Sequence, residues 1–336
     1  MPSLPLRYFF VIPFFALIVS SAQATSINAI YAFGDSLSDA GNVYAATGVP
    51  AAPYVNGHFT NGQVWVQDLA ASLNLGPVTA SLTGGTDYAV GGALSGNLPF
   101  YTATTGDLPW QLAAFQAAHP SANPNGLYTI WIGANDLNAI FATNPTSAQA
   151  AQDVAAIVGN IDSAIGTLAG EGAKNFLVVT VPDLGKTPDA IAGGPAAQVA
   201  ASALSAEFDT LLVNGNSGVG IPSLAGIAAV DSLQLNVLDA YSLLDTVAAE
   251  PGQFGFTNVT QPCLTGEVNF SGGTVCSNPN QYLFWDGLHP TAAGQAIVAE
   301  DAFALVTPEP GTVTLMGMGV VGLLAIWRRR HLARAV

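Results

Sequence analysis

Residues 29–36 read Ala-Ile-Tyr-Ala-Phe-Gly-Asp-Ser, an apolar run that ends at a glycine turn. A short continuous apolar run that stops at turn residues is typical of a strand buried on both faces. Three later segments repeat this pattern: Leu127–Ile132, Phe176–Val181 and Ala225–Val230. We therefore expect four buried strands, with polar side chains placed directly after them.

Segments with helical character separate these strands. They are Asn61–Leu73, Leu108–Ala118, Ala148–Leu168, Ala196–Val213 and Ala292–Leu305. Strands that alternate with helices require crossover connections, which produce a parallel sheet covered by helices on both faces. The sequence thus predicts an α/β fold with three layers, α/β/α. Residues 253–281 are irregular and rich in Gly, Asn and Pro, and we interpret them as an excursion from this single domain.

Two polar residues follow directly after predicted strands. Ser36 comes after the first strand, and Asn135 comes after the strand that begins at Leu127. Because ligands of parallel sheets bind outside the carboxyl ends of the strands, these two side chains can meet at one edge. A serine on such a turn can act as a nucleophile when a base removes its proton. The alternative for Ser36 is an N-cap of the following helix, a common role for serine.

A base for Ser36 is available near the end of the chain. His289 follows Asp286 by three residues, so one turn of chain can place the carboxylate against the imidazole and fix its tautomer. The other histidines of the body are His58, in a polar turn, and His119, before a proline at a predicted helix end where a cationic imidazole is favoured. The alternative for His289 is a capping or surface role.

Hydrogen-bond donors for an oxyanion are also present. A side-chain amide at Asn135 and backbone N–H groups of the glycine-rich stretch 84–93 are donors of the type that tetrahedral oxyanions need. The alternative for this stretch is a strand followed by a flexible turn. It is not a phosphate-binding loop, because no Lys-Ser/Thr pair follows it.

Five blocks of this chain together resemble the GDSL (SGNH) lipase/esterase family. They are residues 33–42 (Phe-Gly-Asp-Ser-Leu-Ser-Asp-Ala-Gly-Asn), 56–65, 88–93, 133–136 (Gly-Ala-Asn-Asp) and 286–290 (Asp-Gly-Leu-His-Pro). The second block is similar to a segment shared by plant-type and thermolabile-hemolysin-like members. The resemblance covers about residues 28–306, and the ordered set of blocks is specific.

The resemblance implies a role for each matched residue. Ser36 is the nucleophile, His289 is the base and Asp286 orients the histidine. The N–H groups of Ser36 and Gly92 and the side-chain amide of Asn135 form the oxyanion hole. The family further implies a flavodoxin-like SGNH hydrolase fold and hydrolysis of carboxylic esters with no metal and no cofactor. Counting from Ala89 favours Gly92 over its neighbour Gly91, which stays open as the alternative donor.

The two ends of the chain have the character of export signals. Residues 1–24 combine Arg7, an apolar run from Tyr8 to Val19 and the Ala22-Gln23-Ala24 cleavage pattern, so they are predicted to be a signal peptide. The alternative is an N-terminal membrane anchor, for which the apolar run is short.

Residues 307–336 resemble a PEP-CTERM sorting signal. Thr307-Pro308-Glu309-Pro310 precedes an uncharged stretch at 311–327, and three arginines at 328–330 follow it. The stretch is marginally long enough to span a bilayer, with the arginines on the cytoplasmic side. The resemblance implies a Gram-negative source, transient anchoring in the inner membrane, processing by an exosortase and release to the envelope or extracellular matrix. Thr307 stands where valine is usual, and a plain tail anchor is the alternative.

Cys263 and Cys276 are the only cysteines, and they lie 13 positions apart in the irregular segment. In an exported chain this arrangement predicts a disulfide that closes the loop. The alternative is two free thiols. Their spacing does not fit a metal site, and none is expected.

The body of the chain is strongly acidic. Residues 25–309 contain two lysines and all 22 acidic residues, a net charge of −20. Such a surface repels nucleic acid and anionic lipid, so neither is expected as a partner. The expected partner is a small-molecule or lipid ester.

Three functional hypotheses follow. The first is an exported serine esterase or lipase comprising residues 25–306. The second is an inactive envelope or matrix protein that keeps the fold. The third is a polysaccharide O-deacetylase that uses the same catalytic residues. The residue types at all five site positions favour an enzyme, while the sequence leaves the acyl preference open.

Overall fold

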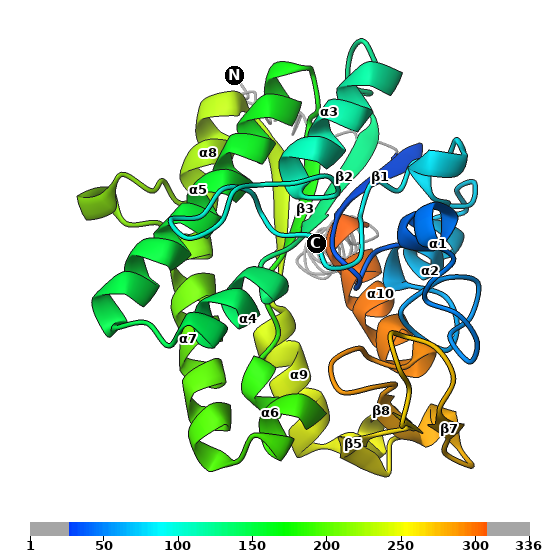
Figure 1. Cartoon of the computed structure of the whole chain (residues 1–336). Helices are drawn as coiled ribbons and strands as arrows, with labels where there is room; N and C mark the ends of the chain where they lie inside the picture. Colours follow the sequence, from blue (N-terminus) through cyan, green and yellow to red (C-terminus); the bar gives the residue numbers. More distant parts are fainter. Residues whose placement is uncertain (1–26, 308–336) are drawn as a thin grey trace, which may run out of the picture.

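The computed structural model describes residues 27–307. Its centre is a parallel sheet with the strand order β1-β2-β3-β4. The strands are β1 (Ala29–Gly34), β2 (Gly126–Trp131), β3 (Asn175–Val179) and β4 (Gln234–Leu238). Helices cover the sheet on both faces, which confirms the predicted α/β fold (Figure 1).

The alternation of side chains along β1 explains why the sheet has two cores. Successive residues of a strand point to opposite faces. Accordingly Tyr31 and Phe33 pack into one apolar cluster, and Ile30 and Ala32 pack into the other. A strand that is buried on both faces needs apolar residues at every position, which is the pattern of residues 29–33.

Each face of the sheet has its own set of helices. The face of Tyr31 and Phe33 is covered by α3 (Leu108–Ala118), α5 (Ser147–Gly170), α7 (Pro195–Asn214) and α8 (Leu224–Asp231). The opposite face is covered by α2 (Trp65–Ser72) and α10 (Ala292–Val306), which also pack against each other. The predicted helices therefore exist, except that the first begins at Trp65 rather than Asn61.

The prediction of a strand at Ala225–Val230 is wrong. These residues form helix α8, whose N-cap Ser223 accepts a hydrogen bond from the N–H of Gly226. The run is rich in alanine, which favours helix over strand. The fourth strand is β4, which lies at the edge of the sheet and is only partly buried, so it lacks the continuous apolar run of the central strands.

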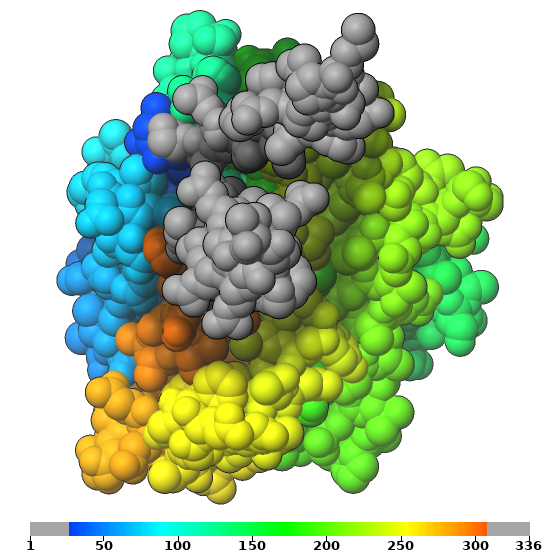
Figure 2. Space-filling model, turned by 180° about the vertical axis from the view of Figure 1, so that it is seen from behind, coloured from blue at the N-terminus to red at the C-terminus, as the bar shows by residue number. Residues whose placement is uncertain are grey.

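Shorter elements connect this frame. The helices are α1 (Asn42–Thr47), α4 (Ala134–Thr143), α6 (Pro188–Ala192) and α9 (Ala240–Ala249), with 3₁₀ turns η1 (Ser81–Thr83), η2 (Leu184–Lys186), η3 (Ser217–Val219), η4 (Pro251–Phe254) and η5 (Pro279–Gln281). Figure 2 shows from behind that α9 and η4 (yellow) lie beside α10 (orange), and Val247, Phe256 and Ile297 pack together there.

The irregular segment forms two small sheets. Strand β5 (Asn258–Pro262) pairs with β8 (Tyr282–Phe284), and β6 (Leu264–Thr265) pairs with β7 (Thr274–Val275). The predicted disulfide is present and joins Cys263 to Cys276. It closes the loop that contains β6 and β7.

A glycine-rich segment continues the sheet beyond the free edge of β1. The N–H of Tyr88 donates to the carbonyl of Ala32 at 2.7 Å, and the N–H of Val90 donates to that of Gly34 at 3.1 Å. Asp87 forms a parallel bridge with Ala32. The segment therefore carries Gly91 and its neighbours to the turn that follows β1.

The terminal signals lie outside the described residues. The signal peptide at residues 1–24 and the membrane-spanning stretch at residues 311–327 therefore stay predictions from the sequence. Among the helices of residues 27–307, none has the length and apolar character needed to span a membrane.

Candidate active site

Ser36 lies in a tight turn at the carboxyl end of β1. The N–H groups of Ser38 and Asp39 both donate to the carbonyl of Asp35, which closes the turn. Gly34 has a φ of 155°, and a Cβ at this position would lie 2.2 Å from the carbonyl oxygen of Trp131, so glycine is required there. The N-cap of the next helix is Gly41, not Ser36, so the capping alternative is wrong.

A continuous chain of hydrogen bonds joins Ser36 to the end of the molecule. The Oγ of Ser36 lies 2.8 Å from Nε2 of His289, and Nδ1 of His289 lies 2.8 Å from Oδ2 of Asp286. All three side chains are buried. Oδ1 of Asp286 accepts the N–H groups of Leu288 at 2.9 Å and His289 at 2.7 Å, so the turn of chain holds the carboxylate against the imidazole.

The electrostatics of this pair favour a basic imidazole. Burial by itself lowers the pKa of His289, but the charge of Asp286 and the hydrogen bond to it raise the pKa above its ordinary value of 6.5. Burial by itself raises the pKa of Asp286, whereas His289 and the two backbone N–H groups lower it below 3.8. Asp286 is therefore ionised at neutral pH, and His289 can hold a proton taken from Ser36.

Three hydrogen-bond donors lie at the same edge of the sheet. Among the hydrogen bonds of residues 27–307, the N–H groups of Ser36 and Gly92 have no acceptor. Asn135 follows β2 in the first turn of α4, and its side-chain amide donates to the carbonyl of Ala93 at 3.1 Å, which fixes the amide beside the glycine segment.

The geometry distinguishes between the two candidate glycines. The N–H of Gly91 donates to Oδ2 of Asp39 at 2.8 Å, so it is already used. A Cβ on Gly91 would lie 2.3 Å from the ring of Phe59, whereas one on Gly92 would meet nothing within 4 Å. Gly92 has a φ of 81° and faces open space.

Buried carboxylates tie these segments together. Asp39 accepts the N–H groups of Gly41, Asn42 and Gly91, which links the turn of Ser36 to the glycine segment. Asp136 accepts the N–H and the hydroxyl of Ser95, which links α4 to the same segment. The site is thus rigid before any substrate arrives.

Asp35 differs from these carboxylates because one of its oxygens has no hydrogen-bond partner among the described residues. Oδ1 accepts the N–H of Leu37 at 3.0 Å, while Oδ2 is buried and has no partner among the described residues. Burial raises the pKa of Asp35 to about 6. The group is therefore partly protonated near neutral pH.

No sequence motif indicates the role of Tyr54 at this site. Its hydroxyl donates to Oδ2 of Asp286 at 2.8 Å. Tyr54 precedes the recognised block 56–65 and has no motif of its own, and only the folded chain brings it to a residue 232 positions away. The sequence contains no spacing that could have revealed this contact.

The two remaining histidines have other surroundings. Nδ1 of His58 lies 2.7 Å from the carbonyl of Gly62, in a buried turn. His119 packs in an aromatic cluster with Tyr31 and Phe115. His119 is the C-cap of α3, as predicted, and burial lowers the pKa of its imidazole, which opposes the favourable effect of the helix end on the cationic form.

An apolar cavity opens beside Ser36. Ser36 and Asn135 belong to its lining, and the remaining wall is mostly apolar side chains from α9, β8 and α10. These include Ala240, Leu243, Leu244, Val247, Leu283, Phe284, Ile297 and Val298. A neighbouring groove between α4, α6 and α7 shares Leu184, Thr187 and Leu288 with this cavity.

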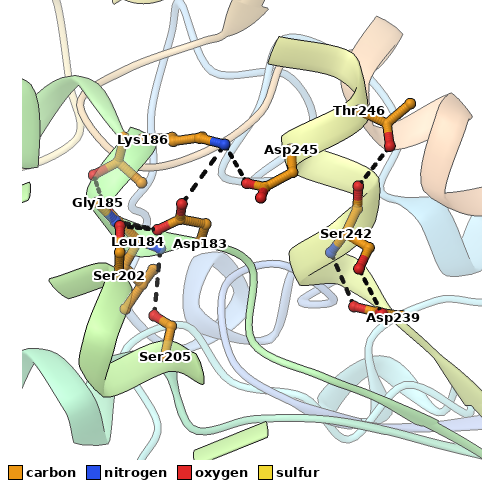
Figure 3. Close-up of polar contacts among 11 residues, drawn as sticks. Asp183, Leu184, Gly185, Lys186, Ser202, Ser205, Asp239, Ser242, Asp245 and Thr246 are labelled. Carbon is orange, nitrogen blue, oxygen red and sulfur yellow. Dashed lines mark hydrogen bonds and ion pairs between the residues drawn. The ribbon is translucent and has the colours of Figure 1, made fainter. Parts of the chain in front are cut away.

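One lysine forms ion pairs that link two elements near the cavity. Lys186 on η2 pairs with Asp183 at 3.8 Å and with Asp245 on α9, and Figure 3 shows it between these two carboxylates. Leu184 of η2 and Leu244 of α9 both line the cavity, so the ion pair joins two elements that border it. Lys186 and Asp245 are 36% and 40% exposed, so the pair contributes about 1 kcal/mol at most.

Comparison with known protein families identifies the family of this chain. The family model described as GDSL-like Lipase/Acylhydrolase matches residues 30–302. The chain belongs to the GDSL lipase/acylhydrolase family. This confirms the resemblance and makes the chain a carboxylic ester hydrolase. The PEP-CTERM protein-sorting motif matches residues 306–330, which marks the chain for export through a Gram-negative envelope.

Individual relatives are distant but span most of the chain. A thermolabile hemolysin of Vibrio parahaemolyticus is 28% identical and aligns with 84% of this chain, which spans 64% of the hemolysin. A GDSL esterase/lipase of Arabidopsis thaliana is 27% identical over 87% of this chain and 90% of its own length. A phosphatidylcholine-sterol acyltransferase of Aeromonas hydrophila is 26% identical over 87% and 94%.

Solved structures include an acetylxylan esterase of Geobacillus stearothermophilus. It is 13% identical, covers 84% of this chain and 97% of its own, and has a TM-score of 0.43.

Proposed function

We propose that this GDSL family member is an exported serine esterase that works through an acyl-enzyme on Ser36. The observation that carries the proposal is the unbroken hydrogen-bond chain from Ser36 through His289 to Asp286. The residues that the chain brings together are those needed for nucleophilic attack on a carboxylic ester.

In the first half of the reaction, the ester is cleaved. His289 takes the proton of Ser36 as Oγ attacks the carbonyl carbon, and Asp286 stabilises the imidazolium. The N–H groups of Ser36 and Gly92 and the amide of Asn135 bind the oxyanion of the tetrahedral intermediate. Collapse of this intermediate breaks the ester C–O bond, and His289 gives its proton to the departing alcohol.

In the second half, the acyl group is released to water. His289 now takes a proton from a water molecule, which attacks the acyl-enzyme carbonyl. The same donors bind the second oxyanion, and the proton on His289 returns to Ser36 as the carboxylic acid leaves. Each turnover consumes one water and needs no metal or cofactor in this scheme.

The cavity beside Ser36 and the groove that adjoins this cavity suit the two parts of an ester. The apolar walls of the cavity between α9 and α10 favour a hydrocarbon chain, so we assign the acyl group to it. The neighbouring groove includes Asn138 and Asp189 in its lining, so we assign the alcohol to it. This arrangement favours a lipase-like substrate over an acetylated polysaccharide.

A series of aryl esters of increasing acyl length tests this assignment. Each buried CH₂ is worth up to about 0.8 kcal/mol, so kcat/KM is expected to rise by up to about fourfold per methylene from acetate until the cavity is full. Leu244→Trp fills the cavity and is expected to remove the gain for long chains while leaving acetate hydrolysis within about threefold of the wild type.

Val199→Trp is the matched control, since Val199 is 71% exposed on α7. It is expected to keep the wild-type profile. A profile that is highest for acetate and unchanged in Leu244→Trp would instead favour the deacetylase hypothesis.

The inactive-scaffold hypothesis has its own test. A fluorophosphonate probe reacts only with an activated serine, so the folded protein is expected to be labelled at Ser36. Absence of labelling in a protein that melts cooperatively would favour a non-enzymatic role.

Activity is expected to fall as the pH falls. The reaction needs the neutral form of His289, whose pKa lies above 6.5 because of Asp286. Protonation of His289 therefore removes the base, and kcat/KM should decline as the pH drops through the pKa of His289. A kcat/KM profile measured from about pH 5 to about pH 9 checks this, and a flat profile across the acid half would contradict the role of His289.

We also propose how the chain reaches its place of action. The signal peptide at residues 1–24 would direct export, and the stretch 311–327 would hold the chain in the inner membrane until an exosortase-type enzyme processes the tail. The sorting motif at residues 306–330 supports this sequence of events. The hydrolase domain would then act in the cell envelope or extracellular matrix.

A further inference from the structure

Tyr54 completes the hydrogen bonding of the carboxylate beside the histidine. Its hydroxyl donates at 2.8 Å to Oδ2 of Asp286, the oxygen that also lies 2.8 Å from Nδ1 of His289. The other oxygen, Oδ1, is already occupied by the N–H groups of Leu288 and His289. The carboxylate therefore cannot rotate without breaking one of these bonds.

Tyr54 itself is held by the loop that the disulfide closes. Its buried ring packs against Phe270 and Trp285, with ring centroids 6.0 and 6.1 Å apart. Cys263 belongs to the same buried cluster. The phenol thus reaches Asp286 from a packed wall and not from a mobile side chain.

The backbone that precedes Tyr54 is also bonded to this loop. The N–H of Ala51 donates to the carbonyl of Phe270 at 2.9 Å, and the N–H of Gly272 donates to that of Ala52 at 2.9 Å. The N–H of Tyr54 donates to the carbonyl of Ala51 at 3.1 Å. The tip of the loop and the segment before Tyr54 therefore move together.

The base of the loop is bonded to the strand that leads to Asp286. The N–H of Cys263 donates to the carbonyl of Phe284 at 3.1 Å, and that of Leu264 donates to Trp285 at 2.6 Å. The N–H of Trp285 in turn donates to the carbonyl of His289 at 2.7 Å. One closed loop therefore contacts both Tyr54 and the turn that holds the catalytic pair.

We propose that Tyr54 is a positioning residue for ester hydrolysis, and that the loop closed by Cys263 and Cys276 is the frame that holds it against Asp286. The inference rests on the proposed function. The phenol fixes the orientation of the carboxylate, and the hydrogen bond it donates reduces the negative charge that the imidazole experiences. Loss of the phenol hydroxyl therefore both loosens Asp286 and makes His289 more basic.

Tyr54→Phe tests the role of the hydroxyl alone, because the ring and its packing remain. A hydrogen bond to a charged group supports a loss of about 10-fold in kcat/KM. The acid limb of the pH profile should also move to higher pH. Without the phenol hydroxyl, the imidazole experiences more of the negative charge of Asp286, which raises the pKa of His289. A purely structural residue would lower activity without moving this limb.

Tyr128→Phe is the matched control. Its hydroxyl donates to the carbonyl of Asn123 at 3.1 Å, so the change also removes one phenolic hydrogen bond, but away from Asp286. This variant should keep the wild-type pH limb. The inference is overturned if Tyr54→Phe keeps the wild-type acid limb, whether or not its kcat/KM falls.

A double-mutant comparison tests the frame. The variant with both Cys263→Ala and Cys276→Ala is expected to have a kcat/KM several-fold below that of the wild type. When Tyr54→Phe is already present, the same cysteine changes should lower kcat/KM much less, because both changes act through the same hydrogen bond. Full additivity would overturn the part of the proposal that concerns the loop. If the cysteine variant does not fold, mild reduction of the folded wild type and of folded Tyr54→Phe provides the same comparison.

Failure of this inference is distinguishable from failure of the proposed function. A folded wild type that neither turns over esters nor reacts with a fluorophosphonate overturns the function and the positioning role together. An active wild type with an unaffected Tyr54→Phe variant overturns the positioning role alone.

Discussion

The Ser36→Ala protein is expected to lose about 10⁴-fold or more in kcat for ester hydrolysis. In the wild type, Oγ of Ser36 lies 2.8 Å from Nε2 of His289. The alanine variant therefore has no nucleophile at the end of the hydrogen-bond chain. The proposed oxyanion donors, Gly92 and Asn135, remain, so a small residual rate over water is expected. Steady-state hydrolysis of a chromogenic ester measures the loss.

Ser163→Ala provides the control for this experiment. Ser163 is exposed on α5 and donates only to the carbonyl of Gly159, so its loss should leave the rate unchanged. Hydrolysis by Ser36→Ala at the wild-type rate would show that another group attacks the ester.

The Asp286→Asn protein is expected to lose about 10⁴-fold in kcat, although it keeps the shape of the side chain. The two N–H groups of Leu288 and His289 require an acceptor, so the amide oxygen takes the place of Oδ1. The NH₂ group then faces Nδ1 of His289 and forces the imidazole proton onto Nε2. In that tautomer His289 cannot accept the proton of Ser36.

Asp189→Asn separates the charge of a carboxylate from its hydrogen bond. Asp189 raises the pKa of His289 through its charge, but it makes no hydrogen bond to the imidazole. Its replacement should shift the acid limb slightly to lower pH and change kcat by less than about threefold. Equal losses in the two variants would mean that charge, not tautomer, is the contribution of Asp286.

The first three strands and the contact between His289 and Asp286 could be predicted because each depends on local sequence. The run at residues 29–33 is apolar at every position since β1 is buried on both faces, and the turn after it needs glycine at Gly34. His289 and Asp286 are three residues apart, so their contact needs only one turn of chain. In these cases a local sequence pattern is enough to predict the structure, because the contacts involved are local.

Other features depend on contacts that the sequence does not encode locally. β4 lies at the sheet edge and loses the continuous apolar pattern, while the apolar residues of α8 belong to a helix. The choice between Gly91 and Gly92 requires the bond from Gly91 to Asp39, 52 positions away. The cavity likewise arises only where α9 and α10 come together.

The scarcity of cations has a consequence for the resistance of the folded domain to proteases. Within residues 27–307, Lys174 and Lys186 are the only residues after which a trypsin-like protease can cut. Lys174 directly precedes the buried strand β3, and Lys186 lies in a 3₁₀ turn and is paired with Asp245. Proteases cut preferentially in exposed, loosely held loops. Lys174 is exposed in the connection between α5 and β3, but the buried strand that begins at the next residue holds the chain on its carboxyl side. The acidic composition thus makes the folded domain a poor substrate for this whole class of proteases.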